Sequence, residues 1–294
     1  MKKITLLAIA FTFAIFNLQA QDEELVSKKG FPILPEAGDY AFGVDLAPLV
    51  NFIGGTTTSN GPSFDLSDGM TIFGKYYAEK DMAYRVKFAF NTLSTNFSNY
   101  VTDQSVLIPT PEDQVEDNGA FSYSQFVLGL GFEKRKGKSR LQGYYGADFF
   151  FMYATGSSTN QNFKGTYGND FSANHTMPIS TNFVTPLNGY RTVEVKQGGQ
   201  LGLGLRAFVG VEYFIAPKIS IGGELGWGVA YAIGFDGYQI DEEWDAVAGD
   251  VKSTKVKTAS ANQFIAGSDA SASGFFEGNG WLGLGGSLNL VFHF

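Results

Sequence analysis

Large apolar residues alternate with small or polar residues over eight long stretches of the chain. In 201–213, for example, Leu203 and Leu205 alternate with Gly204 and Arg206. A period of two is the signature of a β-strand whose two faces meet different surroundings. The predicted strands cover 40–52, 70–78, 83–93, 121–133 (with a one-residue slip that puts Tyr123 on the face of Phe126), 140–154, 198–214, 218–235 and 275–294.

The connections between these stretches alternate between short and long. The short ones are 79–82, 134–139 and 215–217, and the long ones are 53–69, 94–120, 155–197 and 236–274. Bacterial outer-membrane barrels have an even number of strands, short periplasmic turns and long extracellular loops. The chain therefore predicts an all-β fold, a membrane-spanning antiparallel up-and-down β-barrel over 40–294 with eight strands. Ten strands remain an alternative, because 182–187 and 190–197 also look strand-like.

The N-terminal residues have the layout of a secretory signal peptide. Two lysines precede an apolar run that ends at Phe16, and Ala20 precedes an acidic stretch. The run is shorter than the roughly 20 residues of a membrane-spanning helix. We expect 1–20 to be a signal peptide cleaved near Ala20, and 21–39 to be a short periplasmic lead.

Composition separates a membrane barrel from a secreted β-sandwich, which also produces a period of two. Charged residues make up 17% of the chain, compared with about 25% in soluble domains. The second face of the strands is mostly Gly, Ser and Ala, which suits a narrow, filled lumen. Aromatic residues lie near the predicted strand ends, as in the interfacial girdles of membrane barrels: Tyr76, Tyr77, Tyr84, Tyr123, Tyr213, Trp227, Tyr231, Trp281 and Phe294.

The export signal, the eight alternating stretches and the terminal Phe together resemble the small OmpA-type outer-membrane β-barrels. Residues 287–294 are similar to the C-terminal assembly signal of that class: Ser287, Phe292 and Phe294 match it, whereas Asn289 stands where Gly is preferred. The resemblance implies that the barrel-assembly machinery is a partner during insertion. It also implies that outer-membrane lipid and lipopolysaccharide surround the barrel.

Nine charged residues fall on the predicted inner face. The interior of an eight-stranded barrel is just wide enough for side chains to fill it, so charges removed from water there must pair. The pattern predicts a lumen charge network that either plugs the barrel or acts as a gate whose pairs rearrange to pass ions. The predicted members are Asp45, Lys75, Arg85, Lys87, Glu133, Asp148, Arg206, Glu212 and Glu224.

Several kinds of chemistry have little support. A net charge of −8 without a basic block argues against a nucleic-acid partner, and the absence of Cys excludes disulfides and thiolate metal sites. No second ligand lies at metal-binding spacing from His175 or His293, so we expect no metal and no cofactor. A lipid-modifying enzyme would need a catalytic group, and the sequence contains one candidate, His175 with Ser172, Ser180 or Asp170. We expect that the protein is not an enzyme.

The charged connections are expected to be solvated surfaces. The loops 94–120 and 236–274 are rich in acids without calcium-loop spacing, and one short turn is rich in bases: Lys134, Arg135, Lys136, Lys138 and Arg140. The favoured function is a structural, binding or docking role, in which 155–197 and 236–274 meet an extracellular ligand or a membrane complex. The alternatives are a narrow channel for ions or small solutes and, less favoured, the lipid-modifying enzyme.

Overall fold

The computed structural model describes residues 25–46, 70–157, 159–186, 190–268 and 287–294. The predicted signal peptide, the loop 53–69 and Trp281 lie outside these residues. Within the described ranges, no helix is long and apolar enough to cross a membrane.

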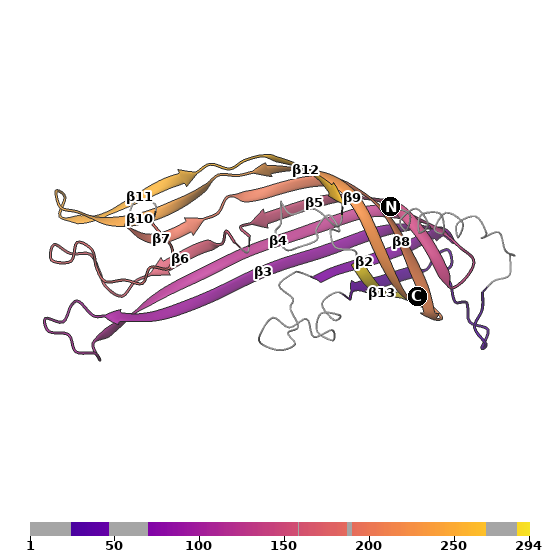
Figure 1. Ribbon diagram of the computed structural model, residues 1–294, viewed down its shortest axis with the longest axis horizontal. Coiled ribbons are helices and arrows are strands. Elements are labelled where there is room, and N and C mark those ends of the chain that lie inside the picture. Colours follow the sequence, from indigo (N-terminus) through magenta and orange to yellow (C-terminus); the bar gives the residue numbers. More distant parts are fainter. Residues whose placement is uncertain (1–24, 47–69, 158, 187–189, 269–286) are drawn as a thin grey trace, which may run out of the picture.

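Eight antiparallel strands close a ring (Figure 1). Each pairs with the next in the order β1-β2-β3-β4-β5-β8-β9-β13, and β13 pairs with β1 to complete the circle. The prediction of an eight-stranded barrel is confirmed, since the further described strands are not members of this closed ring. The ring strands are β1 (Tyr40–Asp45), β2 (Met70–Glu79), β3 (Met82–Thr102), β4 (Gln114–Lys136), β5 (Leu141–Thr155), β8 (Gly199–Ala216), β9 (Ile219–Gly234) and β13 (Ser287–His293).

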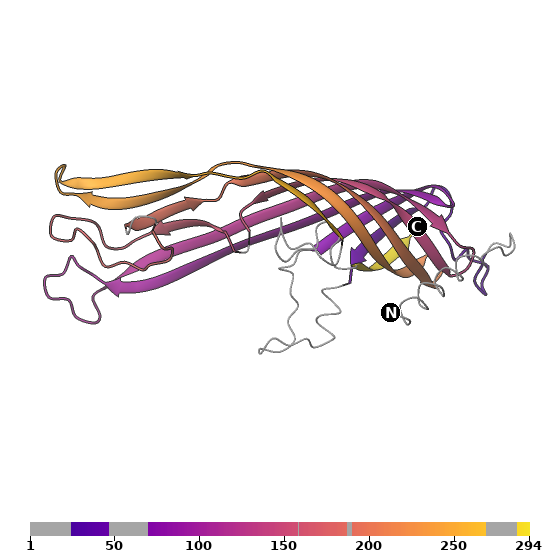
Figure 2. The same cartoon turned by 45° about the horizontal axis from the view of Figure 1, so that its top comes forward.

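The other described strands lie at the end of the barrel that carries the long connections. They are β6 (Asn162–Thr166), β7 (Arg191–Lys196), β10 (Gly237–Asp245), β11 (Asp250–Thr258) and β12 (Gln263–Ser268). The first four continue from β4 in the order β6-β7-β10-β11, whereas β12 pairs with β9. Figures 1 and 2 show this sheet, together with the far ends of β3 and β4, projecting well beyond the ring. We call the sheet of β6, β7, β10 and β11, together with these ends of β3 and β4, the extension.

The segments expected as loops therefore contain strands. β3 and β4 stay paired without a break up to Thr102 and Gln114, across most of 94–120. Alternation weakens in this part of the chain because water meets most of both faces, as the largely exposed positions of β3 beyond Thr92 show. Of the two strand-like stretches noted in 155–197, the second is β7, and it joins the extension rather than the ring.

The outer face of the ring carries a belt of exposed apolar side chains. On β8, Leu203 and Leu205 are 50% and 59% exposed, whereas the alternating Arg206 and Phe208 are almost completely buried inside. Soluble monomeric proteins rarely expose so large a continuous apolar surface, whereas a barrel that spans a bilayer needs one against the lipid. Further members of the belt are Val86, Phe88, Leu128, Leu130, Phe149, Val209, Leu225 and Val229.

Two aromatic residues expected in the girdles lie inside instead. Tyr77 and Tyr123 are 0% and 4% exposed. The predicted one-residue slip that placed Tyr123 on the face of Phe126 does not occur, because β3 and β4 pair without any register shift. The other described girdle residues are exposed outward: Tyr76, Tyr84, Tyr213, Trp227, Tyr231 and Phe294.

Candidate functional site

Charged side chains from six strands (β2, β3, β4, β5, β8 and β9) meet inside the ring, nearer the short turns. The structure brings together eight of the nine predicted residues; the side chain of Asp45 lies outside what it describes. All of them are nearly inaccessible except Lys87, whose side chain is 20% exposed. One further residue, Arg135, belongs with them. The lumen network comprises Lys75, Arg85, Lys87, Glu133, Arg135, Asp148, Arg206, Glu212 and Glu224.

Glu224 on β9 is the centre of the outer half of the network. Its carboxylate accepts hydrogen bonds from Arg85 and Lys87 at 2.8 Å each and from Arg206 at 2.5 Å. β3, which carries Arg85 and Lys87, lies opposite β9 in the ring. Asp148 neutralises the same cations, 3.3 Å from Arg206 and 3.6 Å from Arg85. These ion pairs therefore cross the full width of the lumen.

The inner half of the network is centred on Glu133 and Glu212. Lys75 on β2 lies 3.0 Å from Glu133 and 3.8 Å from Glu212, which is on the opposite strand β8. Glu212 also accepts hydrogen bonds from Arg135 and from the hydroxyl of Ser220. With several partners for each carboxylate, the charges are compensated in a region that excludes water.

His293 and aromatic rings complete the inner half. The Nε2 atom of His293 lies 3.2 Å from Glu212, and its ring contacts the rings of Tyr77 and Phe214, with centroids 5.6 and 5.2 Å away. The Arg135 guanidinium also faces these two aromatic rings. Such contacts stabilise a cation that has been removed from water.

Arg135 corrects the prediction of a fully solvated basic turn. It is 3% exposed, whereas Lys134, Lys136 and Lys138 are exposed. The sequence does contain the signal, because Arg135 lies two residues after the inward Glu133 and a strand returns to the same face every second residue. The strand β4 simply continues to Lys136, three residues beyond its predicted end.

An apolar layer lies on the outer side of the lumen network. Its buried members are Val127, Phe150, Met152, Ala154 and Ala230. Next along the barrel comes a polar layer in which the amide of Asn91 lies 3.4 Å from the Tyr123 hydroxyl, with Gln125 beside them. The barrel interior is thus occupied by successive layers of buried side chains.

The extension is fastened by buried polar groups. Asp117, which is 0% exposed, accepts hydrogen bonds from the backbone amides of Gly168 at 2.9 Å and Thr181 at 2.6 Å. Asp241 is 2% exposed and accepts a hydrogen bond from the Thr192 hydroxyl at 2.6 Å. The expectation of purely solvated acidic loops is therefore wrong at these two positions. Both carboxylates join segments that are distant in the sequence.

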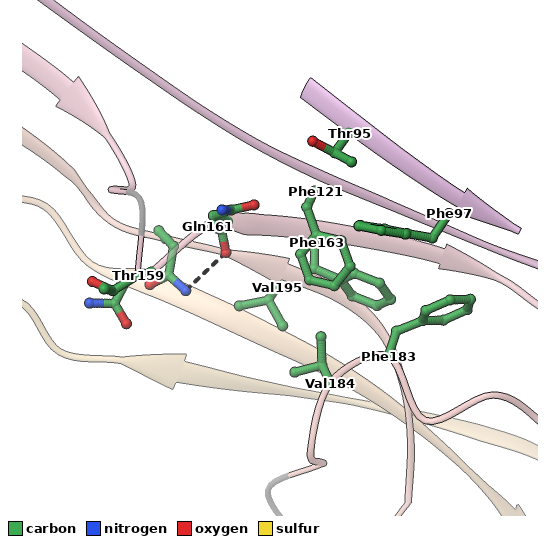
Figure 3. A pocket seen from close by; sticks show the side chains of 11 residues that line it. Thr95, Phe97, Phe121, Thr159, Gln161, Phe163, Phe183, Val184 and Val195 are labelled. Carbon is green, nitrogen blue, oxygen red and sulfur yellow. Dashed lines mark hydrogen bonds between the residues drawn. The ribbon is translucent and has the colours of Figure 1, made fainter. Parts of the chain in front are cut away.

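A cavity of about 560 Å³ opens on the inner face of the extension, where β3, β4, β6 and β7 meet (Figure 3). Sequence reasoning missed it because its walls come together only through the pairing of β6 with β4 and β7. We call it the mouth cavity. It is lined by Thr95, Phe97, Phe121, Thr159, Asn160, Gln161, Phe163, Phe183, Val184, Val195 and Gln197.

The candidate catalytic histidine lies in a local turn. The Oγ atom of Ser172 is 3.3 Å from Nδ1 of His175 and also accepts a hydrogen bond from the backbone amide of His175. This is the geometry of a turn stabilised by a serine three residues earlier. Among the described residues, no group of three or more His, Cys, Asp or Glu side chains is placed to hold a metal ion.

The predicted assembly signal lies at the closing strand of the ring. Ser287 begins β13, Phe292 is partly buried and Phe294 is 73% exposed. The backbone of Phe294 exchanges two hydrogen bonds with Tyr40, of 2.8 and 3.1 Å. The role of these residues as a signal stays a prediction.

Deleting Phe294 is expected to slow insertion into membranes that contain the barrel-assembly machinery. The deletion removes the terminal aromatic ring and both hydrogen bonds to Tyr40. The rate can be followed as the appearance of heat-modifiable, folded barrel on gels. Phe294→Tyr, which keeps the ring and the backbone, serves as the control. Equal rates for the deletion and the control would count against a terminal assembly signal.

No protein-family model matches the chain, and no curated protein matches it. Solved structures that are similar to it include two outer membrane proteins. The outer membrane protein OprG from Pseudomonas aeruginosa shares 10% identity with a TM-score of 0.35, over 89% of this chain and 98% of that one. A major outer membrane protein from Thermus thermophilus shares 12% identity with a TM-score of 0.32, over 88% and 100% of the two chains.

Proposed function

We propose that the chain is an integral outer-membrane barrel, closed across its lumen, that has a structural, binding or docking role through its extracellular extension. The observation that carries this proposal is the set of ion pairs between opposite strands, above all the one between Arg85 and Glu224 at 2.8 Å. The apolar belt around the ring supports the membrane location. With short turns on the periplasmic side, the extension faces outward.

The energetics of the lumen network favour a closed barrel. Each ion that crosses would have to separate pairs whose members are at most 5% exposed, apart from Lys87. Breaking a buried pair by removing one partner costs about 3–5 kcal/mol, and the network contains several such pairs. The apolar layer outside it would add the cost of hydrating Phe150 and Met152.

The extension supplies surface for a binding or docking role. It is a folded sheet rather than a set of loose loops, because Asp117 and Asp241 tie its segments together. A preorganised surface loses less conformational entropy when a partner binds. We place no catalytic step on it, since the Ser172–His175 contact belongs to a turn.

A gated channel is the second candidate, and one observation favours it. Lys87 lies at the outer side of the lumen network with 20% of its side chain exposed, and it pairs with the same carboxylate as Arg85. A partly exposed lysine of this kind would be the first member to exchange partners if the pairs rearranged.

Planar-bilayer recording of the refolded barrel separates the two candidates. The wild type is expected to show no reproducible conductance steps. Arg85→Ala removes the cation that crosses the lumen to Glu224 and is expected to introduce steps. Lys252→Ala, on exposed β11, serves as the control and is expected to stay silent. Steps in the wild type whose ion selectivity changes in Asp148→Asn would establish a channel and overturn the closed-barrel proposal.

A further inference from the structure

We propose that the mouth cavity binds a neutral small molecule that carries an aromatic ring. This inference deepens the proposed function, because it names a class of ligand for the binding role. It rests on the proposal that binding takes place at the extension and not in the lumen. It is argued from the chemistry of the walls, the volume and the way in which the chain holds the aromatic side chains in place.

Four phenylalanine rings form one continuous wall of the cavity. The centroids of Phe97 and Phe121 lie 5.7 Å apart with an edge-to-face arrangement, those of Phe121 and Phe163 lie 4.9 Å apart, and those of Phe163 and Phe183 lie 5.9 Å apart. Figure 3 shows these rings gathered beside Val184 and Val195. The spacings fall in the range that aromatic pairs prefer, so a ligand ring can extend the same packing.

None of the described residues that line the cavity is charged. A carboxylate, phosphate or ammonium group would leave water here without an opposite charge to compensate it. The polar part of the lining consists of amides and hydroxyls, from Thr95, Thr159, Asn160, Gln161 and Gln197. Such groups suit a hydroxyl, carbonyl or amide on the ligand and fix its orientation.

Two glycines allow the aromatic wall to form. A Cβ atom at Gly119 would lie 2.9 Å from the ring of Phe183, and one at Gly165 would lie 2.9 Å from the ring of Phe163. The ring of Phe183 thus rests directly on the backbone of β4. The ring of Tyr167 lies beside that of Phe183, with centroids 6.2 Å apart, and burial raises the pKa of its hydroxyl to about 12.

The volume fits a ligand of one or two rings. Cavities for small molecules usually span about 300–1,000 Å³, and the mouth cavity has about 560 Å³. It lies on the inner face, outward of Tyr123, so a ligand reaches it from the extracellular side. The lumen network lies deeper, beyond the apolar layer.

The test uses the refolded full chain in lipid nanodiscs and isothermal titration calorimetry. The probe is 2-naphthol, and 2-naphthoate is its charged counterpart; empty nanodiscs give the lipid background. We expect saturable binding of one 2-naphthol per chain and at least tenfold weaker binding of 2-naphthoate. Phe183→Ala and Val184→Glu, both between β6 and β7, should each weaken 2-naphthol binding at least tenfold. Phe264→Ala, at an aromatic that is 71% exposed and outside the cavity, is the control and should bind as the wild type does.

The outcomes separate this inference from the proposed function. Binding that does not saturate, equal binding of both probes, or unchanged binding by folded Phe183→Ala and Val184→Glu would overturn the inference. A barrel that binds 2-naphthol but conducts ions would overturn the closed lumen and leave the mouth cavity in place. A barrel that conducts no ions and fails to bind 2-naphthol would overturn the ligand site in the mouth cavity and leave the closed lumen in place.

Discussion

Replacing Glu224 by Gln is expected to lower the free energy of unfolding of the barrel by about 3–5 kcal/mol, the cost of removing one partner from a buried ion pair. The carboxylate is the shared partner of Arg85, Lys87 and Arg206, and its side chain is 2% exposed. A neutral amide keeps the shape but leaves these cations with Asp148 and Glu133 alone. Urea unfolding of liposome-inserted protein, followed by tryptophan fluorescence, measures the change.

Glu243→Gln is the matched control for this experiment. Glu243 pairs with Lys252 at 2.9 Å in the extension, where the lysine side chain is 57% exposed. An exposed pair of this kind contributes at most about 1 kcal/mol. Similar small losses in both variants would mean that water reaches the lumen network, which would support the gated channel.

Replacing Leu205 by Arg is expected to reduce assembly, with a cost of about 2–4 kcal/mol if the position lies near the bilayer midplane. Leu205 is 59% exposed on the outer face of β8, where it pairs with Phe149 on one side and Val229 on the other. The guanidinium would have to enter hydrocarbon without a partner. The yield of folded protein in liposomes and its urea midpoint measure the effect.

Val247→Arg tests whether any added arginine has the same effect. Val247 is fully exposed in the turn between β10 and β11, so the substitution should leave assembly unchanged. Normal insertion of Leu205→Arg would contradict the assignment of this face of β8 to lipid.

The barrel could be predicted from the sequence because a membrane strand meets two constant surroundings along its length. The alternation of Leu203 and Leu205 with Gly204 and Arg206 continues over many residues, and the burial pattern of β8 follows it. Beyond the membrane this contrast disappears. The continuation of β3 to Thr102 and the strands of the extension therefore left only a weak pattern in the sequence.

The sequence predicts which residues form the lumen network, but it does not predict which of them pair with one another. A period of two assigns residues to the inner face, but it does not give the stagger between opposite strands that brings Arg85 to Glu224. That stagger is a property of the closed ring. The mouth cavity depends on still more distant pairings, such as Phe121 with Phe163 and Phe163 with Val195, and no local signal predicts them.

The ring can close only when β1 pairs with β13, and until then the chain can associate with other chains through its open strand edges. Partners such as Ala41 and His293 come from opposite ends of the polypeptide, whereas β2 to β5 form hairpins with their neighbours. Until β13 pairs with them, β1 and the first part of β9 present unpaired edges, and unpaired edges recruit strands from other molecules. The seven residues of β13 therefore cover two edges at once, and their pairing turns an aggregation-prone sheet into a closed ring of eight strands.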